Sequence, residues 1–420
     1  MTDPRIVMKF GGTSVADLER INRVADAVEA EVATGVGVAV TVSAMAGETN
    51  RLVDLVAKAG PAAPALDAEG LEYDAVVSTG EQVTSGLLAL VLQSRGYRAR
   101  SWQGWQIPLK TDRAHGRARI MDIDGERLGE AIDGGEIAVI AGFQGVADDE
   151  RISTLGRGGS DTTAVAIAAA LNAERCDIYT DVDGVYTTDP RITKNARRLE
   201  KISYEEMLEL ASMGAKVLQT RSVELAMAHR VRLRVLSSFI PPDGFNPGTI
   251  ICDEDDIVEK SIVSGVAVAR DEARISVLGV PDEPGRASEM FRLLADAGVN
   301  IDMIVQSPSR DGASANLSFT LPEGDLDRAR ELLVAKQGAI GFEAVNAERE
   351  VAKISVVGVG MKSHTGVAST MFGALAEKGI NIHNISTSEI KISVLIDSAY
   401  AELAVRALHA AYGLDAPRAA

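Results

Sequence analysis

Residues 9–14 read Lys9-Phe10-Gly11-Gly12-Thr13-Ser14 and stand where a predicted strand, Arg5 to Phe10, gives way to a helix. The two glycines let the backbone approach an anion closely, so their N–H groups can point at phosphate oxygens. Lys9 adds a point cation beside them. The spacing differs from the Walker pattern, which needs a longer glycine loop with Lys followed by Ser or Thr. Because a strand ending in Gly-Gly is often a simple tight turn, this motif alone predicts a phosphate-binding turn and nothing more.

The residues that follow alternate between strand and helix patterns. Further strands are predicted at 36–43, 137–142 and 176–180, and helices at 17–33, 51–58, 82–95 and 161–171. The last helix is expected to begin after Ser160, a suitable N-cap residue. This alternation predicts an α/β fold, in which a mostly parallel sheet is sandwiched by helices. Ligands of such sheets collect at the carboxyl ends of the strands, where the glycine-rich turns of this chain fall.

The C-terminal third contains an internal repeat. Residues 275–279 (ISVLG) match 354–358 (ISVVG), and 298–302 (GVNID) match 379–383 (GINIH). Each copy reads as a βαββαβ module, too small to bury both faces of its sheet, so the copies should pack on each other or on a partner subunit. A purely structural duplication is the alternative. The predicted domains are 1–245, a linker with the first strand of the C-terminal region at 246–268, and modules at 269–345 and 346–420.

Composition limits the classes of partner. The 420 residues carry a formal net charge of −17, which repels nucleic acid and anionic membrane surfaces. The two cysteines, Cys176 and Cys252, are too few for a disulfide framework. The sequence shows no signal peptide, and no apolar run is expected to be long enough to span a bilayer. A cytoplasmic protein is therefore expected.

Two further motifs carry charges suited to a small zwitterionic ligand. Arg157 lies in the glycine-rich stretch 155–161 and can hold a carboxylate bidentately. Asp161, at the predicted helix start, can orient Lys9 or a metal-bound phosphate, although a simple capping carboxylate is the alternative. Glu81, at the start of another helix, can accept an ammonium group, or it can serve only as a partner of the helix dipole.

Other polar residues suggest a nucleotide loop and no metal centre. The stretch 179–186 ends a strand in a polar turn, followed by Asp189-Pro190-Arg191, in which Arg191 can meet phosphate. The five histidines show no metal-ligand spacing, and none has a Ser or Cys partner of a catalytic kind. No protein-bound metal is predicted.

Taken together, these motifs resemble the aspartokinase family, which has the amino-acid kinase fold followed by tandem C-terminal ACT domains. Stretches 9–15, 42–45, 78–81, 142–145, 156–161, 180–191, 212–217 and 221–222 match the family's motifs in order, and the two repeats match the ACT pair. The resemblance covers essentially the whole chain. It implies an enzyme that transfers a phosphoryl group from ATP, as its Mg²⁺ complex, to L-aspartate, giving 4-phospho-L-aspartate, the entry to lysine, threonine and methionine biosynthesis.

The resemblance also implies the roles of individual residues. The catalytic positions are Lys9 and Asp161. The ATP-binding positions are Lys9, Phe10, Gly11, Gly12, Ser43, Thr180, Asp181, Tyr186, Thr187, Thr188, Asp189, Pro190, Arg191, Lys216 and Val217. The aspartate-binding positions are Thr49, Glu81, Arg157, Gly158, Gly159 and Ser160.

ACT domains resemble sensors of small amino acids, which implies feedback inhibition by lysine, threonine or both, and a homodimer or higher oligomer formed through these modules. The implied effector positions are Asp282, Gly285, Ala287, Asn300, Ile301, Asp302 and Gln306 in the first module, and Val367, Asn381, Ile382, Ser388 and Glu389 in the second. The loop 361–364 is similar to the corresponding loop of those aspartokinases that lysine and threonine inhibit together.

The sequence departs from the family pattern at two places. The stretch 104–108 lacks the family's Gln-Ala-Gly, and no methionine lies between Asp253 and Val268 to start a separate regulatory subunit.

Two alternative functions remain open. The first alternative is a kinase of acetylglutamate, glutamate or uridylate. The second is a catalytically silent amino-acid sensor, against which the presence of Lys9, Arg157 and Asp161 argues.

Overall fold

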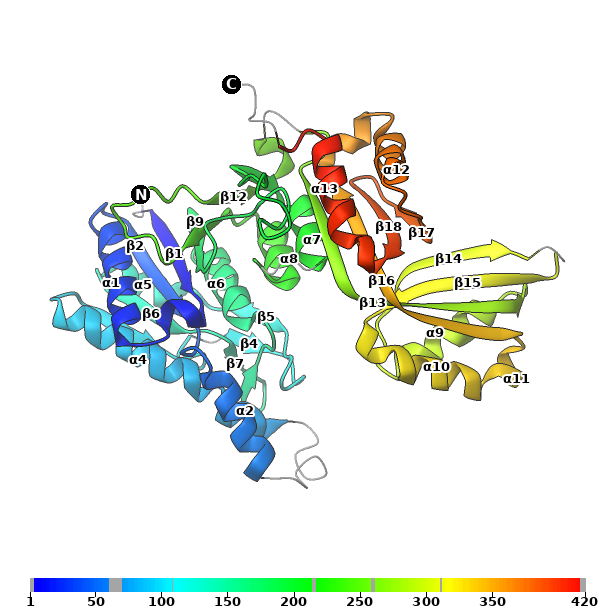
Figure 1. The fold of residues 1–420 in the computed structure, drawn as a ribbon. Coiled ribbons are helices and arrows are strands. Elements are labelled where there is room, and N and C mark those ends of the chain that lie inside the picture. The colour runs from blue at the N-terminus through cyan, green and yellow to red at the C-terminus, as the bar shows by residue number, and fades with distance from the viewer. Residues whose placement is uncertain are drawn as a thin grey trace. The chain divides into compact units, whose positions relative to one another are not determined.

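The computed structural model describes residues 4–59, 70–107, 109–213, 217–257, 261–309 and 312–415. These residues form two compact units. The first takes most of the chain up to residue 257, and the second takes residues from 261 onward. The second unit also includes Tyr186–Arg197, a segment that interrupts the first unit in sequence. Figure 1 shows the chain coloured from its N-terminus to its C-terminus.

An eight-stranded sheet forms the centre of the first unit. Its strand order is β10 (Lys201–Ser203), β12 (Thr249–Cys252), β11 (Leu233–Ser237), β9 (Arg175–Thr180), β1 (Arg5–Phe10), β2 (Gly37–Val42), β6 (Ile137–Ala141) and β3 (Ala99–Trp102). Every neighbouring pair is parallel except β11 and β12. The predicted α/β fold with a mostly parallel sheet is confirmed.

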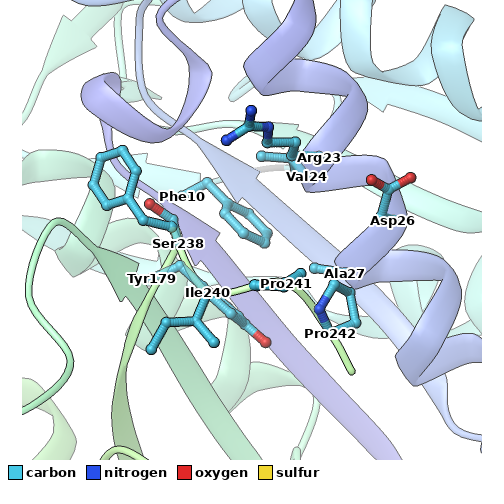
Figure 2. Close-up of a pocket in the computed structure, with 11 residues that line it drawn as sticks. Phe10, Arg23, Val24, Asp26, Ala27, Tyr179, Ser238, Ile240, Pro241 and Pro242 are labelled. Carbon is cyan, nitrogen blue, oxygen red and sulfur yellow. The ribbon is translucent and has the colours of Figure 1, made fainter. Parts of the chain in front are cut away.

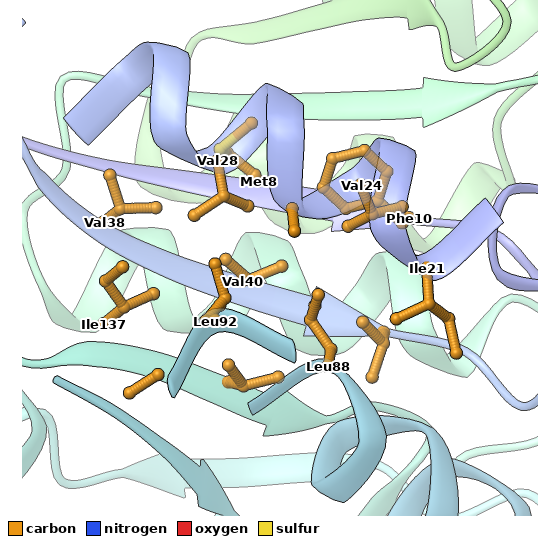
Figure 3. Packing of buried hydrophobic residues seen from close by; sticks show 14 of the residues in the cluster. Met8, Phe10, Ile21, Val24, Val28, Val38, Val40, Leu88, Leu92 and Ile137 are labelled. Carbon is orange, nitrogen blue, oxygen red and sulfur yellow. The ribbon is translucent and has the colours of Figure 1, made fainter. Parts of the chain in front are cut away.

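Helices cover both faces of this sheet. One face carries α1 (Leu18–Val32) and α4 (Thr79–Ser94), and the other carries α5 (Glu126–Asp133) and α6 (Gly159–Ala170). The Asp17 side chain caps α1 by accepting the Arg20 N–H at 2.8 Å. Figure 3 shows how Met8 and Phe10 of β1 pack under α1 on this face. Because side chains alternate along a strand, Lys9 between them points to the opposite face, toward α6.

The first unit contains further helices and a second, smaller sheet. They are the helices α2 (Glu48–Ala59), α3 (Leu71–Val77), α7 (Tyr204–Ser212) and α8 (Thr220–His229), and a small sheet of order β5 (Ile120–Ile123), β4 (Leu109–Thr111), β7 (Gln144–Val146) and β8 (Ile152–Thr154). A 3-10 turn, η1 (Gly12–Val15), follows β1 directly.

One helical stretch has the length and composition of a membrane span. Within the described ranges, the stretch Leu71–Ser94 is long and apolar enough to cross a membrane by length and composition, and half of its most apolar window is buried inside the protein. This stretch joins α3 to α4, and α4 packs on β3 and β6 with a buried glutamate, Glu81, in its first turn.

The second unit is built on one antiparallel six-stranded sheet. Its order is β14 (Asp302–Pro308), β15 (Ser314–Leu321), β13 (Gly265–Pro281), β16 (Ala344–Val357), β18 (Lys391–Asp397) and β17 (Asn384–Thr387). The helices are α9 (Arg286–Asp296), α10 (Leu326–Ala335), α11 (Gln337–Ile340), α12 (Val367–Glu377) and α13 (Ala401–Ala411). Short 3-10 turns complete the two units at Glu254–Asp256, Glu323–Asp325, Val359–Ser363 and Ser398–Tyr400.

The internal repeat is visible in the backbone of this unit. Both α9 and α12 begin after a left-handed glycine, Gly285 and Gly366, and end before another, Gly298 and Gly379. The long strands β13 and β16 belong to both copies: residues 265–269 pair with 353–357, and residues 274–278 pair with 344–348. The second copy therefore takes one of its strands from the segment that precedes the first copy, which the contiguous βαββαβ pattern did not predict.

Candidate active site

Lys9 and Asp161 form an ion pair at the carboxyl end of β1. The Nζ atom of Lys9 lies 2.5 Å from Oδ1 of Asp161, which belongs to the first turn of α6. The two residues are 8% and 9% exposed, so water screens the pair only weakly. The helix α6 begins earlier than expected, since Gly158 rather than Ser160 is its N-cap and adopts the left-handed conformation (φ 73°). Asp161 is thus a first-turn residue whose carboxylate faces Lys9.

A cavity of about 460 Å³ opens beside this pair. It is lined by Lys9, Gly12, Ser43, Ala44, Met45, Ala46, Gly47, Thr49, Tyr73, Glu81, Gly116, Phe143, Gly156, Arg157, Gly158, Gly159, Ser160 and Asp161. The cavity brings together all six residues expected to bind aspartate and both residues expected to be catalytic. The described residues of the divergent stretch 104–107 do not line it.

The glycine turn meets this cavity through Gly12. The Gly11 N–H is already engaged, because it donates to the Tyr179 carbonyl at 3.3 Å. A Cβ on Gly12 would lie 2.9 Å from the Ala44 carbonyl oxygen, so only glycine lets this turn approach the loop after β2. Gly12 is therefore the glycine placed to meet an anion in the cavity.

Glu81 is the buried carboxylate of the cavity. It is 3% exposed, and its Oε1 accepts the Ala44 N–H at 3.0 Å. Its Oε2 is buried and has no hydrogen-bond partner among the described residues. Burial raises the pKa of Glu81 to about 7, although the hydrogen bond from Ala44 opposes this shift. A buried acceptor without a partner is costly, so a cationic donor bound in the cavity would stabilise it.

Arg157 is the exposed cation of the cavity. It makes no hydrogen bond or ion pair with any other residue in the described ranges, and it lies between two left-handed glycines, Gly156 and Gly158. A Cβ on Gly158 would lie 2.1 Å from Gln219, and one on Gly159 would lie 2.8 Å from Phe143. The glycines thus let the Arg157 loop lie against its neighbours while the guanidinium stays available for a carboxylate.

Several residues of the cavity were not singled out from the sequence as site residues. Phe143 adopts a left-handed conformation (φ 69°) that is rare for an aromatic residue, and its N–H donates to the Thr163 hydroxyl at 3.1 Å. Such strain is typical of functional sites. The signal for Phe143 was its place in the motif 142–145, whereas Tyr73 and Gly116 lie in no motif that predicted a ligand.

Phe10, expected to bind ATP, has its side chain on the other face of the sheet. Its ring stacks on Tyr179 with centroids 4.5 Å apart, and both rings line a second cavity of about 310 Å³ beneath α1 and residues 238–242. Figure 2 shows Phe10, Tyr179 and Pro241 around this cavity. Only the backbone of Phe10 can therefore face the cavity that holds Lys9 and Asp161.

The remaining residues expected to bind ATP are divided between the two units. Ser43, Thr180 and Asp181 belong to the first unit, and Tyr186 to Arg191 belong to the second. Thr187 and Thr188 are buried, and the Thr187 hydroxyl lies 2.8 Å from Nε2 of His409 on α13. Val217 is half-buried before α8, and Lys216 lies outside the described residues.

The expected effector positions lie in turns, at helix starts and at edge strands of the second unit. Asp282, Gly285 and Ala287 surround the start of α9, Asn300 to Asp302 and Gln306 lie at β14, and Val367, Asn381, Ile382, Ser388 and Glu389 occupy the equivalent parts of the second copy. Asp302 is not free, since its Oδ2 lies 2.7 Å from Nζ of Lys353, which also pairs with Glu272 at 2.7 Å. Although burial opposes ionisation of Asp302, Lys353 outweighs it and lowers the Asp302 pKa.

Comparisons with known proteins agree with this architecture. Residues 4–237 match the model of the amino acid kinase family, and residues 273–335 and 354–412 each match a model of the ACT domain. The fold and the cavity at the end of β1 thus define an amino acid kinase domain followed by two ACT domains.

The similar sequences are more specific. The chain is 52% identical to the aspartate kinase of Pseudomonas fluorescens, over 98% of each chain, and 46% identical to the aspartokinase of Corynebacterium glutamicum, over 97% of this chain and 96% of that one. Among solved structures, Escherichia coli aspartokinase III in complex with aspartate and ADP superposes with a TM-score of 0.75 at 28% identity, over 97% of this chain and 99% of that chain. The same enzyme in complex with lysine and aspartate gives a TM-score of 0.74 at 29% identity, over the same shares of both chains. The chain therefore belongs to the aspartate kinase family.

Proposed function

We propose that this protein transfers the γ-phosphoryl group of ATP to the side-chain carboxylate of L-aspartate, giving ADP and 4-phospho-L-aspartate. One observation carries this proposal: a single cavity holds an available guanidinium, a buried carboxylate oxygen without a described partner, and a Lys–Asp pair. The first two charges suit the α-carboxylate and α-ammonium groups of an amino acid. Lys9 of the Lys–Asp pair supplies the cation that a transferred phosphoryl group needs.

In this proposal each charge of the amino acid has its own partner. Arg157 takes the α-carboxylate in a bidentate pair, and Oε2 of Glu81 accepts the α-ammonium group. Thr49, Gly158, Gly159 and Ser160 line the same cavity and complete the contacts to the substrate. The side-chain carboxylate of aspartate is then directed toward the Lys9–Asp161 pair.

The nucleophile needs no general base. A side-chain carboxylate has a reference pKa of about 4, so it is already ionised at neutral pH. Catalysis then consists of positioning and of charge neutralisation along the transferred phosphoryl group. Lys9 supplies the cation, Asp161 holds its ammonium group in place, and Gly12 presents backbone to the phosphates.

We assign the nucleotide to Lys9, Phe10, Gly11, Gly12, Ser43, Thr180, Asp181, Tyr186 to Arg191, Lys216 and Val217, with the Phe10 contribution limited to its backbone. Mg²⁺ would arrive with ATP. This fits the residues present, because Mg²⁺ commonly binds substrate phosphates and one or two carboxylates while keeping several waters. Within the described ranges, no group of three or more His, Cys, Asp or Glu side chains could hold a metal ion by itself.

We also propose that the ACT modules mediate feedback inhibition by lysine and threonine acting together, that the protein is cytoplasmic, and that it forms a homodimer or higher oligomer through these modules. Support for an amino-acid effector comes from the relative solved with lysine and aspartate. Assays with lysine alone, threonine alone and both together test the inhibition. Full inhibition by lysine alone would rule out the concerted mode.

The catalytic proposal is tested by measuring ADP release from Mg-ATP in the presence of aspartate, glutamate, acetylglutamate or uridylate. We expect aspartate to stimulate ADP release. The rate with each of the other acceptors should be at least tenfold lower than the rate with aspartate. Release that depends on another acceptor would assign a different amino acid kinase. No release with any acceptor would assign a silent sensor.

A further inference from the structure

Asp74 is a fully buried carboxylate on α3, outside the set of residues that line the active-site cavity. Its two oxygens accept the Gly116 N–H at 3.0 and 3.1 Å, and Oδ2 accepts the Thr154 N–H at 2.8 Å. The Thr154 hydroxyl donates to Oδ1, and Nδ1 of His115 lies 2.8 Å from Oδ2. The other groups that face the two oxygens are backbone N–H groups and a hydroxyl, all of them donors, so we assign Nδ1 of His115 as a fourth donor group.

These donors come from two segments that continue directly into the cavity. Gly116 itself lines the cavity, and Thr154 ends β8, two residues before Gly156 and three before Arg157. The two segments also touch each other, because a Cβ on Gly156 would lie 3.0 Å from the Gly116 carbonyl oxygen. Asp74 lies on α3, and the chain continues from α3 into α4, which carries Glu81 in its first turn. One buried carboxylate therefore joins the three segments that carry Glu81, Gly116 and Arg157.

A second contact fixes the Arg157 loop from another side. The guanidinium of Arg221, on α8, donates to the Leu155 carbonyl at 2.8 Å and to the Ala118 carbonyl at 2.7 Å. The backbone just before Arg157 is thus held at Thr154 by Asp74 and at Leu155 by Arg221. The Arg157 side chain, by contrast, has no partner in the described ranges. Its position depends on the backbone that Asp74 and Arg221 hold.

We infer that Asp74 is a positioning residue for the acidic amino-acid substrate, which sets the distance between the Arg157 guanidinium and the Glu81 carboxylate through buried hydrogen bonds to Thr154 and Gly116. This inference rests on the proposed function. The distance between these two groups selects the spacing of substrate charges, so Asp74 governs affinity for aspartate and discrimination against glutamate without contacting either. Contacts to the nucleotide do not depend on Asp74.

The test compares the full-length protein with its Asp74→Asn variant. Asparagine keeps the size of the side chain but presents an NH2 group to donors, so at least one of the hydrogen bonds is lost. We expect the KM for aspartate to rise at least 20-fold, the KM for ATP to change less than twofold, and the ratio of kcat/KM for aspartate over glutamate to fall at least fivefold. Calorimetric titration with aspartate alone gives the same affinity change without catalysis.

Asp177→Asn is the matched control. Asp177 is also fully buried and accepts hydrogen bonds from Arg175 and Arg234, but it does not line the cavity. We expect this variant to lose thermal stability while keeping the KM for aspartate within twofold. An equal rise in the KM for aspartate in both variants, or none in Asp74→Asn, would overturn the inference.

Three milder variants keep the test decisive if Asp74→Asn fails to fold. Thr154→Val removes only the hydroxyl donor, and His115→Leu removes only the Nδ1 donor, whereas His115→Asn retains an N–H group near the Nδ1 position. We expect a raised KM for aspartate in Thr154→Val and His115→Leu, with partial recovery in His115→Asn. Unchanged values in all three would overturn the inference. A wild-type protein that neither binds nor phosphorylates aspartate would instead refute the proposed function.

Discussion

Nζ of Lys9 lies 2.5 Å from Oδ1 of Asp161, in a pair that connects the end of β1 to the first turn of α6. The strand β1 fixes the backbone of Lys9, and Asp161 on α6 fixes the position of its ammonium group. The cation is therefore held in place before any ligand binds. A preorganised charge of this kind stabilises a transition state without the cost of reorganisation.

Replacement of Lys9 by alanine should affect turnover far more than aspartate binding. We expect kcat to fall by about 10²- to 10³-fold, the scale of a lost preorganised donor, while the KM for aspartate stays within threefold. Lys9→Arg keeps the charge on a different shape and should recover part of the rate. Steady-state kinetics for both substrates provide the measurement. Equal losses in kcat and in aspartate affinity would count against this role, and a raised KM with an unchanged kcat would show that Lys9 contributes only to binding.

Aspartate binding should depend on the protonation of Glu81. Its pKa of about 7 means that the carboxyl group of the free enzyme becomes neutral as the pH falls below 7. Only the ionised form attracts the α-ammonium group, so kcat/KM for aspartate should fall about tenfold per pH unit below that value and level off above it. Glu81→Gln should give a flat and much lower profile. A wild-type profile that is flat between pH 5 and 8 would contradict this role.

The same residue should cost stability above neutral pH. The folded-state pKa of Glu81, about 7, lies above the ordinary value of 4.5 for this side chain. The folded protein therefore binds more protons between pH 4.5 and 7, and its stability falls as the pH rises through that range. Glu81→Gln keeps an acceptor for the Ala44 N–H and removes the buried charge. We therefore expect this variant to melt at a higher temperature than the wild type at pH 8, with a smaller gain at pH 5. Thermal unfolding at the two pH values tests this.

Arg157 should contribute to the affinity for aspartate and not to the stability of the fold. Its side chain is exposed and unpaired within the described ranges, so Arg157→Ala should leave the melting temperature within about 1 °C, as for a surface substitution that breaks no contact. The KM for aspartate should rise about 100-fold, which corresponds to about 2.7 kcal/mol for a lost charge-assisted pair. Arg157→Lys should recover little, because a lysine cannot form the bidentate pair. A KM within threefold of the wild type in Arg157→Ala would refute the assignment.

In the second unit, Lys353 should stabilise the fold through its two carboxylate partners. Burial lowers the pKa of Lys353, but the charge of Glu272 and the hydrogen bond to Asp302 outweigh it and raise the pKa. Lys353→Met leaves both carboxylates without this partner. We expect a loss of about 2 kcal/mol at pH 7, below the usual cost of breaking a buried pair because the Asp302 side chain is partly exposed.

The pH dependence of the stability loss in Lys353→Met follows from the shifted pKa values of Asp302 and Lys353. The Asp302 contribution exists above its unfolded pKa and disappears as the pH falls through its lowered folded pKa. The Lys353 contribution exists below its unfolded pKa and disappears as the pH rises through its raised folded pKa. The loss should therefore be largest between these limits, around neutral pH. Arg349→Met, on the same strand but with exposed partners, is the control and should leave the stability nearly unchanged, because water screens an exposed ion pair. Equal losses in the two variants would contradict a buried pair.

Local patterns were enough to predict the parts of the fold that depend on neighbouring residues. The strand ending at Phe10, the helix α1 and the repeated Gly-Asn turns all follow from periodicity and turn chemistry. The charges of the cavity were also predictable, because Lys9, Glu81 and Arg157 lie in glycine-rich turns at strand ends or at helix starts.

Features that depend on long-range pairing were not predictable in this way. The first residues of β13 complete the sheet of the second repeat, and Tyr186–Arg197 belongs to the second unit, although both segments look locally like ordinary strand and loop. Asp74 joins segments 42 and 80 residues away, and no local pattern distinguishes it from an exposed helical aspartate. The start of α6 was misplaced because the left-handed Gly158, rather than the polar Ser160, occupies the cap.

The identity of the product is the most direct test of phosphoryl transfer to the side-chain carboxylate of aspartate. Incubation with Mg-ATP, L-aspartate and hydroxylamine converts an acyl phosphate into a stable hydroxamate, and chromatography against standards separates the α- and β-hydroxamates of aspartate. We expect β-aspartyl hydroxamate from the wild-type protein and at least 100-fold less from Lys9→Ala. Formation of the α-hydroxamate, of a glutamyl hydroxamate in preference, or of no hydroxamate by an enzyme that binds ATP and aspartate would contradict it.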